Sequence, residues 1–178
     1  MIDNIGSKTP NTSAVNNSGV LNNVGKVDNQ KNGVVNNLLG ATLNNSGTFT
    51  NQSLSSLVND GQIFNDRGFT VAAGGTLSGA GDYNQTAGST TVNGSFAQSN
   101  ILISGGSLGG NGLITGDVAV GAGGTLGPGN SPGALTIDGG FTLAVDATLA
   151  FELGGTGRRT WLRRDRPAAT QRRRRCLP

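Results

Sequence analysis

The pentapeptide GVLNN at residues 19–23 recurs along the first half of this chain, each copy reading Gly, any residue, an apolar residue, any residue and Asn. Full copies are GKVDN at 25–29, GVVNN at 33–37, GTFTN at 47–51 and GQIFN at 61–65. Weaker copies are GATL at 40–43 and GFTV at 68–71. Their glycines follow at steps of 6, 8, 7, 7, 14 and 7 residues, with one glycine missing near Ser55. A recurring unit of this kind indicates a repeat protein.

A unit of about seven residues accommodates one short strand and one corner. Alternating residues place an apolar side chain on the inner face of the strand, and Gly and Asn suit corners because both tolerate positive φ. The two residues recur too often for a helix. Three units make a coil of about 21 residues, which predicts an all-β fold, a right-handed parallel β-helix (β-solenoid) with about seven coils. Asn side chains at equivalent corners are expected to form ladders.

Composition supports a narrow, stacked architecture. The chain has 178 residues, 31 of them Gly, with 4% aromatic and 13% charged residues. Few large side chains are present to fill a wide core, so a narrow core of Val, Ile, Leu and Ala is expected. Low charge with abundant Gly and Asn also fits a disordered linker, and the apolar period favours the solenoid over that alternative.

The second half of the chain changes its repeated phrase to Gly-Gly-Thr/Ser-Leu. Copies lie at 74–77, 105–108 and 123–126, and the last two are 18 residues apart, again close to one coil. The turn GPGNSPG that follows contains Pro128 and Pro132. Because proline fixes φ and lacks an N–H donor, this corner is expected to be stiff and to stay out of the hydrogen-bond ladder.

Residues 105–143, which read GGSLGGNGLITGDVAVGAGGTLGPGNSPGALTIDGGFTL, resemble the passenger-associated transport repeat of bacterial autotransporters. The turn with two prolines is the most specific element of the match. The resemblance implies a β-helical passenger stem that crosses the outer membrane through a C-terminal barrel of the same polypeptide and is displayed at the cell surface or secreted. In that family the stems carry adhesive, catalytic or self-associating regions, and the repeat itself is associated with export.

Two parts of an intact autotransporter are not evident. The first residues, MIDNIGSKTP, lack the apolar run of a signal peptide, and no series of alternating strands of about ten residues predicts a barrel. No apolar segment of about 18 residues predicts a membrane helix. Surface display is therefore expected of an intact parent protein, of which this chain is expected to be a truncated part.

Charge and composition divide the chain into three parts. Residues 1–18 are expected to be poorly ordered, residues 19–157 to form the β-helical stem, and residues 158–178 to be a disordered basic tail. The tail holds nine basic residues and one acidic residue, a net charge of +8, whereas the preceding residues hold four basic and nine acidic residues, a net charge of −5. We attribute this sharp change to a shift of the reading frame near Gly157, which makes the tail non-native.

The tail also permits a functional interpretation. Arg172–Arg175 would fit a phosphate-binding patch, with Trp161 stacked on a base. A short solvated end is the simpler interpretation, so no nucleic-acid partner is expected. Cys176, the only cysteine, lies third from the end, which does not match a prenylation motif. A cysteine-free body fits export through an oxidising compartment.

The residue inventory argues against catalysis. The chain has no His, so the commonest general base and metal ligand is missing. A single Cys excludes zinc sites of the Cys/His type, and the glycine motifs that bind phosphate or calcium are incomplete. We therefore expect no enzyme activity, no catalytic, cofactor-binding or metal-binding residues, and no cofactor.

Paired carboxylates are the one catalytic arrangement that the composition permits, as in solenoid glycosidases and lyases. The candidates are Asp60, Asp66, Asp82, Asp117, Asp138, Asp146 and Glu152. Asp60 and Asp66 are six residues apart, nearly one unit, so both are expected at corners. Solvated turn residues are the simpler interpretation of all seven.

The sequence as a whole favours a non-catalytic structural stem with an adhesin-like role at the bacterial surface. One alternative is a haemagglutinin-like exoprotein secreted by a separate partner barrel, which suits the Asn-rich first half. Another is a fragment of a polysaccharide-active β-helix enzyme, for which a groove with clustered carboxylates and basic residues is expected. The ligand on a host or bacterial surface is not specified by the sequence, and the edges of the solenoid invite self-association.

Overall fold

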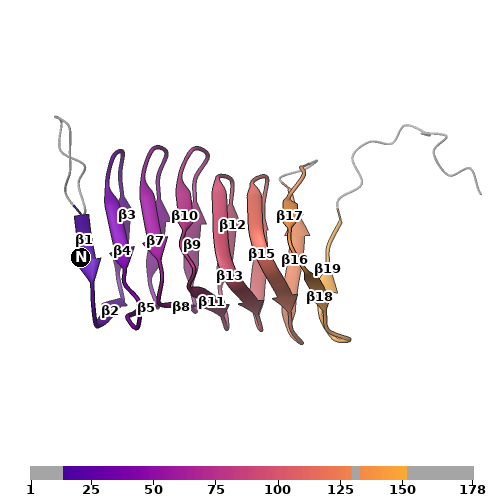
Figure 1. Ribbon diagram of the computed structural model, residues 1–178. Helices are drawn as coiled ribbons and strands as arrows, with labels where there is room; N and C mark the ends of the chain where they lie inside the picture. The colour runs from indigo at the N-terminus through magenta and orange to yellow at the C-terminus, as the bar shows by residue number, and fades with distance from the viewer. Residues whose placement is uncertain (1–13, 130–132, 152–178) are drawn as a thin grey trace, which may run out of the picture.

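The computed structural model describes residues 14–129 and 133–151, which form a parallel β-solenoid (Figure 1). All nineteen elements in these ranges are strands. They stack along one axis, from β1 (Ala14–Asn17) at one end to β19 (Thr148–Leu149) at the other. The predicted right-handed parallel β-helix of about seven coils is confirmed.

Each coil has three sides, and each strand pairs in parallel with strands of the neighbouring coils. Side one contains β1, β4 (Val34–Asn37), β7 (Ser56–Asn59), β10 (Thr76–Ser78), the first halves of β13 (Ser95–Ile103) and β15 (Leu113–Val120), and β17 (Thr136–Asp138). Side two contains β2 (Val20–Asn23), β5 (Thr42–Asn45), β8 (Gln62–Asn65), β11 (Asp82–Gln85), the second halves of β13 and β15, and β18 (Phe141–Leu143). Side three contains β3 (Lys26–Asn29), β6 (Thr48–Asn51), β9 (Gly68–Val71), β12 (Ser89–Val92), β14 (Gly106–Gly110), β16 (Gly124–Pro128) and β19.

The pairing register confirms the predicted coil length. Asn17 and Asn37 lie opposite each other on side one and are 20 residues apart. Asn23 and Asn45 lie opposite each other on side two and are 22 residues apart. The strands of the first coils keep a constant length of four residues, so the corners absorb the variation in coil length.

Alternation along each strand directs one apolar side chain into the solenoid. In β5, Leu43 and Asn45 are buried while the two residues that alternate with them are partly exposed. Equivalent inward positions stack into columns of fully or almost fully buried aliphatic side chains, such as Val35, Leu57, Leu77, Ile63, Ile101 and Ile114. Each such side chain contributes roughly 1.5–3 kcal/mol to folding. Because the columns continue from coil to coil, the core extends along the whole axis.

Four aromatic rings widen the middle of this core, which the sequence analysis assigned to aliphatic side chains alone. Phe49 and Phe69 occupy paired positions on side three and stack with their centroids 5.1 Å apart. The ring of Tyr83, on side two, makes T-shaped contacts with the rings of Phe69 and Phe96, with centroid distances of 5.2 Å and 5.0 Å. The four rings come from all three sides of the solenoid, because Phe96 lies on side one.

The last Asn of each repeat points inward at a corner and forms the ladders that the sequence predicts. In each ladder the Nδ2 of one Asn donates to the Oδ1 of the Asn in the next coil, at 2.6–2.7 Å. The ladders comprise Asn17, Asn37 and Asn59; Asn23, Asn45 and Asn65; and Asn29 and Asn51. Because these buried amides also donate to backbone carbonyls, burial does not leave them unsatisfied.

Stacked four-residue turns form the corners between sides three and one. In the first, Gly33 N donates to Gln30 O at 2.7 Å and Asn32 has a φ of 63°. The equivalent residue is Leu54 in the next coil, with a φ of 59°, and Gly74 in the coil after that. Asn and Gly adopt positive φ readily, whereas Leu does so at a steric cost. Leu54 is therefore a strained and exposed residue.

The first boundary of the solenoid differs from the prediction. The sequence placed residues 1–18 outside the solenoid, but β1 occupies Ala14–Asn17 and pairs with β4. The reason is that Val15 and Asn17 lie opposite Val35 and Asn37, so they continue an inward apolar column and an Asn ladder. The repeat copy at Ala14–Asn17 lacks the leading glycine, so the sequence pattern did not reveal this strand.

The expectation that the proline corner stays out of the ladder is wrong at Pro128. This residue ends β16 and lies in register with Gly110 of β14. The missing N–H has little effect at a strand end, and the next residue, Gly129, donates its N–H to Gly110 O at 2.9 Å. Pro132, the N-terminal residues 1–13 and the predicted tail 158–178, with Trp161, Arg172–Arg175 and Cys176, lie outside the described residues.

Candidate functional site

Side two presents two columns of outward side chains that run along the solenoid axis; we call this surface the side-two face. The first column is Val20, Thr42, Gln62, Asp82, Asn100 and Asp117. The second is Asn22, Asn44, Phe64, Asn84, Leu102, Ala119 and Thr142. Neighbours within a column are about 4.8 Å apart, the spacing of paired strands.

Phe64 interrupts the amides of the second column. Asn44 Nδ2 donates to Asn22 Oδ1 at 2.8 Å, so the column begins as an outer ladder. Phe64 takes the next position, and Asn84 follows it. The phenyl side chain is 39% exposed, because the alternation of β8 turns Ile63 and Asn65 inward and Phe64 outward.

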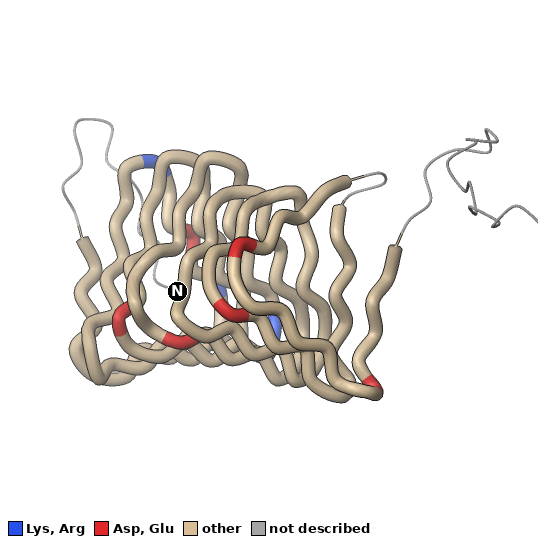
Figure 2. Tube along the Cα trace, turned by 45° about the vertical axis from the view of Figure 1, so that its right-hand side comes forward, with Lys and Arg blue, Asp and Glu red and all other residues tan. Residues whose placement is uncertain are grey.

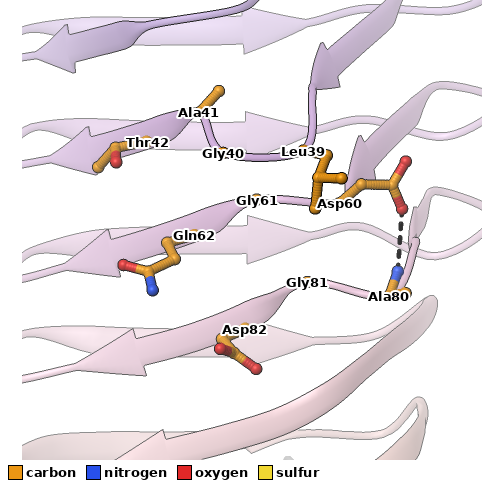
Figure 3. A pocket seen from close by; sticks show the side chains of 10 residues that line it. All are labelled: Leu39, Gly40, Ala41, Thr42, Asp60, Gly61, Gln62, Ala80, Gly81 and Asp82. Atoms are coloured by element: carbon orange, nitrogen blue, oxygen red, sulfur yellow. Dashed lines mark hydrogen bonds between the residues drawn. The ribbon is translucent and has the colours of Figure 1, made fainter.

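A groove of about 440 Å³, the first groove, crosses the corner where the strands of side two begin (Figure 3). Three stacked corners line it, residues 39–42, 60–62 and 80–82. The stacked corners approach each other so closely that Gly61 and Gly81 leave no room for a side chain. A Cβ on Gly61 would lie 2.2 Å from Ala41 O, and a Cβ on Gly81 would lie 2.3 Å from Gly61 O.

Asp60 and Asp82 supply the carboxylates of the first groove. Asp60 Oδ1 accepts a hydrogen bond from Ala80 N at 3.0 Å (Figure 3). Asp82 Oδ1 accepts from Asn100 Nδ2 at 2.8 Å. Each carboxylate therefore holds the next coil in place, which gives both a structural role.

A second groove, of about 300 Å³, lies at the opposite end of β8. Its lining includes Asn44, Ser46, Phe64, Asp66 and Thr86. Ser46 Oγ donates to Asp66 Oδ2 at 3.0 Å. Phe64 therefore lies on the side-two face between the two grooves. It lines the second groove itself, and Gln62, two residues earlier on the same strand, lines the first groove.

Charged residues are sparse along the coils (Figure 2). The basic residues of the described ranges are Lys26, Lys31 and Arg67, and none of them lines the first or the second groove. Lys26 is engaged with Asp28, at 3.5 Å between Nζ and Oδ2. The two grooves carry only acidic and neutral side chains, so they do not attract a polyanion.

The structure separates most of the candidate carboxylates. Asp60 and Asp82 share the first groove, and Asp66 lies in the second, so Asp60 and Asp66 do occupy corners as expected. The others are dispersed: Asp117 accepts a hydrogen bond from Gly140 N, Asp138 ends β17, Asp146 lies in the turn before β19, and Glu152 lies outside the described residues. No group of three His, Cys, Asp or Glu side chains that could hold a metal ion occurs in residues 14–129 and 133–151.

Among the titratable groups of the residues that the structure describes, only Tyr83, which lies inside the core, has a strongly shifted pKa. Its hydroxyl is 2.5 Å from Thr90 Oγ1, and Thr90 in turn donates to Gln85 Oε1. Burial raises the pKa of Tyr83 above the usual value of a phenol, and its hydrogen bonds offset only part of that rise. The neutral phenol is a structural member of the core, out of reach of a substrate.

Sequence reasoning did not single out Phe64 as a functional residue. The signal was present, because the residue before the final Asn is Asn, Asp, Asn and Thr in the other full copies and Phe only in GQIFN. The grooves left no comparable signal, since they arise only when corners about one coil apart are stacked.

Comparison of the chain with family models, with curated proteins and with solved structures found no match. Among residues 14–129 and 133–151, the structure contains no helix with the length and hydrophobicity of a membrane span.

Proposed function

We propose that this chain is a section of a non-catalytic, adhesin-like stem from an autotransporter passenger, displayed at or secreted from a bacterial surface. The observation that carries the proposal is the core, which runs through all seven coils in stacked columns. Seven coils span roughly 30 Å on the spacing of paired strands. Such a rod extends a surface away from its attachment point.

The stretch that resembles the passenger-associated transport repeat supports this proposal by its position. Residues 105–143 include β14, β15, β16, β17 and β18, which belong to the last three coils. The stretch continues the solenoid without a break in pairing, since β14 pairs with β12 before it and with β16 after it. A stem with a C-terminal export element is the arrangement that the resemblance implies.

A non-catalytic role is supported by the carboxylates. Asp60 and Asp82 already accept hydrogen bonds that tie neighbouring coils together. The chain has no His to serve as a general base, and the lining of the first groove lacks a cation to bind an acidic sugar. These features disfavour the polysaccharide-active enzyme.

Surface display is the direct test. The full chain is placed between a signal peptide and the translocating barrel of an autotransporter, and intact cells are treated with protease. We expect the added protease to cleave the stem of the complete fusion. A matched fusion that lacks the barrel is the control, and its stem should be protected from the protease. Retention of the stem inside intact cells that carry the complete fusion would contradict the proposal.

The Asn ladders of the first coils support the haemagglutinin-like exoprotein as a second candidate, because that hypothesis rests on the Asn-rich half of the chain. The gene distinguishes the two. A barrel-coding frame that resumes downstream of Gly157 supports the autotransporter and the proposed frame shift, whereas a separate neighbouring gene for a partner barrel supports the exoprotein.

A further inference from the structure

Phe64 is an exposed aromatic side chain on the side-two face, with Asn44 and Asn84 next to it along the solenoid axis. Phe64 is 39% exposed and occupies a position where the outer ladder of Asn22 and Asn44 would accommodate another amide. Isolated exposed apolar residues are ordinary on protein surfaces. Phe64 differs from them because it lines the polar second groove, and because Gln62 of the same strand lines the first groove.

The surroundings of Phe64 supply hydrogen-bonding groups on every side. Asn44 and Asn84 flank it along the axis. Gln62 precedes it on the outer side of β8 and lines the first groove, and Asp66 and Thr86 line the second. An apolar platform with a few convergent amides, carboxylates and hydroxyls is the usual composition of a ligand site.

Charge narrows the class of ligand. The two grooves contain Asp60, Asp82 and Asp66 and no basic residue. Nucleic acids and acidic polysaccharides would meet only like charges or neutral groups here. A neutral carbohydrate fits both kinds of group, because its axial C–H groups pack on an aromatic face while its hydroxyls bond to carboxylates and amides.

Repetition along the axis favours a polymer over a single sugar. The two columns together present at least one polar or aromatic side chain per coil, at intervals of about 4.8 Å. That interval is comparable with the length of one pyranose in an extended chain, so successive sugars can meet successive coils. A peptide strand has less to gain, because the backbone groups of β8 are already paired with β5 and β11.

We propose that the side-two face around Phe64 binds a neutral polysaccharide, whose chain lies along the solenoid axis with one sugar stacked on the Phe64 ring. The inference rests on the proposed adhesin-like function and names the chemical class of its ligand. Asn44 and Asn84 hydrogen-bond the adjacent sugars, and the grooves on either side accommodate their substituents.

The test uses the full chain in affinity electrophoresis through gels that contain hydroxyethylcellulose, mannan, dextran or, as the acidic comparison, alginate. We expect retardation by at least one neutral polymer, little sensitivity to salt, and no retardation by alginate. Phe64→Asn, which restores an amide to the column, is expected to weaken binding at least tenfold, and Phe64→Tyr is expected to retain it. Leu113→Ser is the matched control, because Leu113 is 40% exposed but lies on side one.

Each result decides the matter. Failure of all three neutral polymers to retard the protein overturns the inference, as does binding to alginate alone or equal binding by Phe64→Asn and the unaltered chain. Circular dichroism and a melting curve for each variant show that a loss of binding is not a loss of folding. Surface display without polysaccharide binding would contradict this inference and would leave the proposed stem function supported. Polysaccharide binding without surface display would support this inference and contradict the proposed stem function.

Discussion

Gln98 reaches across a whole coil to hydrogen-bond Asn59. Asn59 Nδ2 lies 2.5 Å from Gln98 Oε1, although the two residues are 39 positions apart. Gly79 stands between them in the ladder and has a φ of 114°. A Cβ at Gly79 would lie 2.2 Å from Asn59 O, so this coil cannot contribute a side chain. The longer amide of Gln98 takes over the role of the missing Asn.

Gln98→Ala is expected to lower the free energy of unfolding by about 1–3 kcal/mol, because the buried Asn59 amide loses the side-chain acceptor of its Nδ2 and keeps only longer hydrogen bonds to backbone carbonyls. Urea unfolding measures the change. Gln62→Ala is the control, since Gln62 is an exposed residue of the same type and its replacement should alter stability by less than about 0.5 kcal/mol. Equal losses in the two variants would show that the long-range hydrogen bond contributes nothing.

Leu54→Asn is expected to stabilise the chain by about 0.5–1 kcal/mol, since Asn tolerates the φ of 59° that Leu54 is forced to adopt. Asn32 already occupies the equivalent place one coil earlier. Thermal unfolding provides the measurement. In the control, Leu39→Asn, an exposed leucine is replaced at a turn where the following Gly40 carries the positive φ. An equal gain in both variants would attribute the effect to exposure and not to backbone strain.

Phe69→Ala is expected to cost about 3–5 kcal/mol, the usual range for deleting a buried ring. Phe69 contacts the rings of Phe49, Tyr83 and Phe96, so its removal opens a cavity that three neighbours border. Phe64→Ala makes the same chemical change on the outer face and should cost far less. Denaturant unfolding of both variants compares them, and similar losses would mean that the inner cluster does not organise the core.

Stability at alkaline pH is expected to depend on Tyr83, the only tyrosine. Below about pH 10 the phenol is neutral in both the folded and the unfolded chain. Above that pH the unfolded chain ionises, while burial raises the pKa of Tyr83 in the folded chain and keeps it neutral. The free energy of unfolding should therefore fall by about 1.4 kcal/mol per pH unit more steeply in the unaltered chain than in Tyr83→Phe. Parallel slopes for the two proteins above pH 10 would contradict this expectation.

Local chemistry explains why so much of the fold was predictable. The alternation in GVLNN and its copies sets which residues face inward, and Gly and Asn set where the chain bends, so the coil length of about 21 residues and the Asn ladders followed directly. The start at Ala14 was missed because that copy lacks its glycine. Pro128 was misjudged because a terminal strand residue does not need its N–H.

Contacts that depart from the repeat could not be obtained in the same way. The meeting of Phe69 with Tyr83 and Phe96, the reach of Gln98 past Gly79 and the grooves beside Phe64 all join residues from different sides or different coils. The repeat determines the winding because each unit encodes its own strand and corner. Only the stacked chain decides which side chains become neighbours, because that depends on how each coil is displaced against the next.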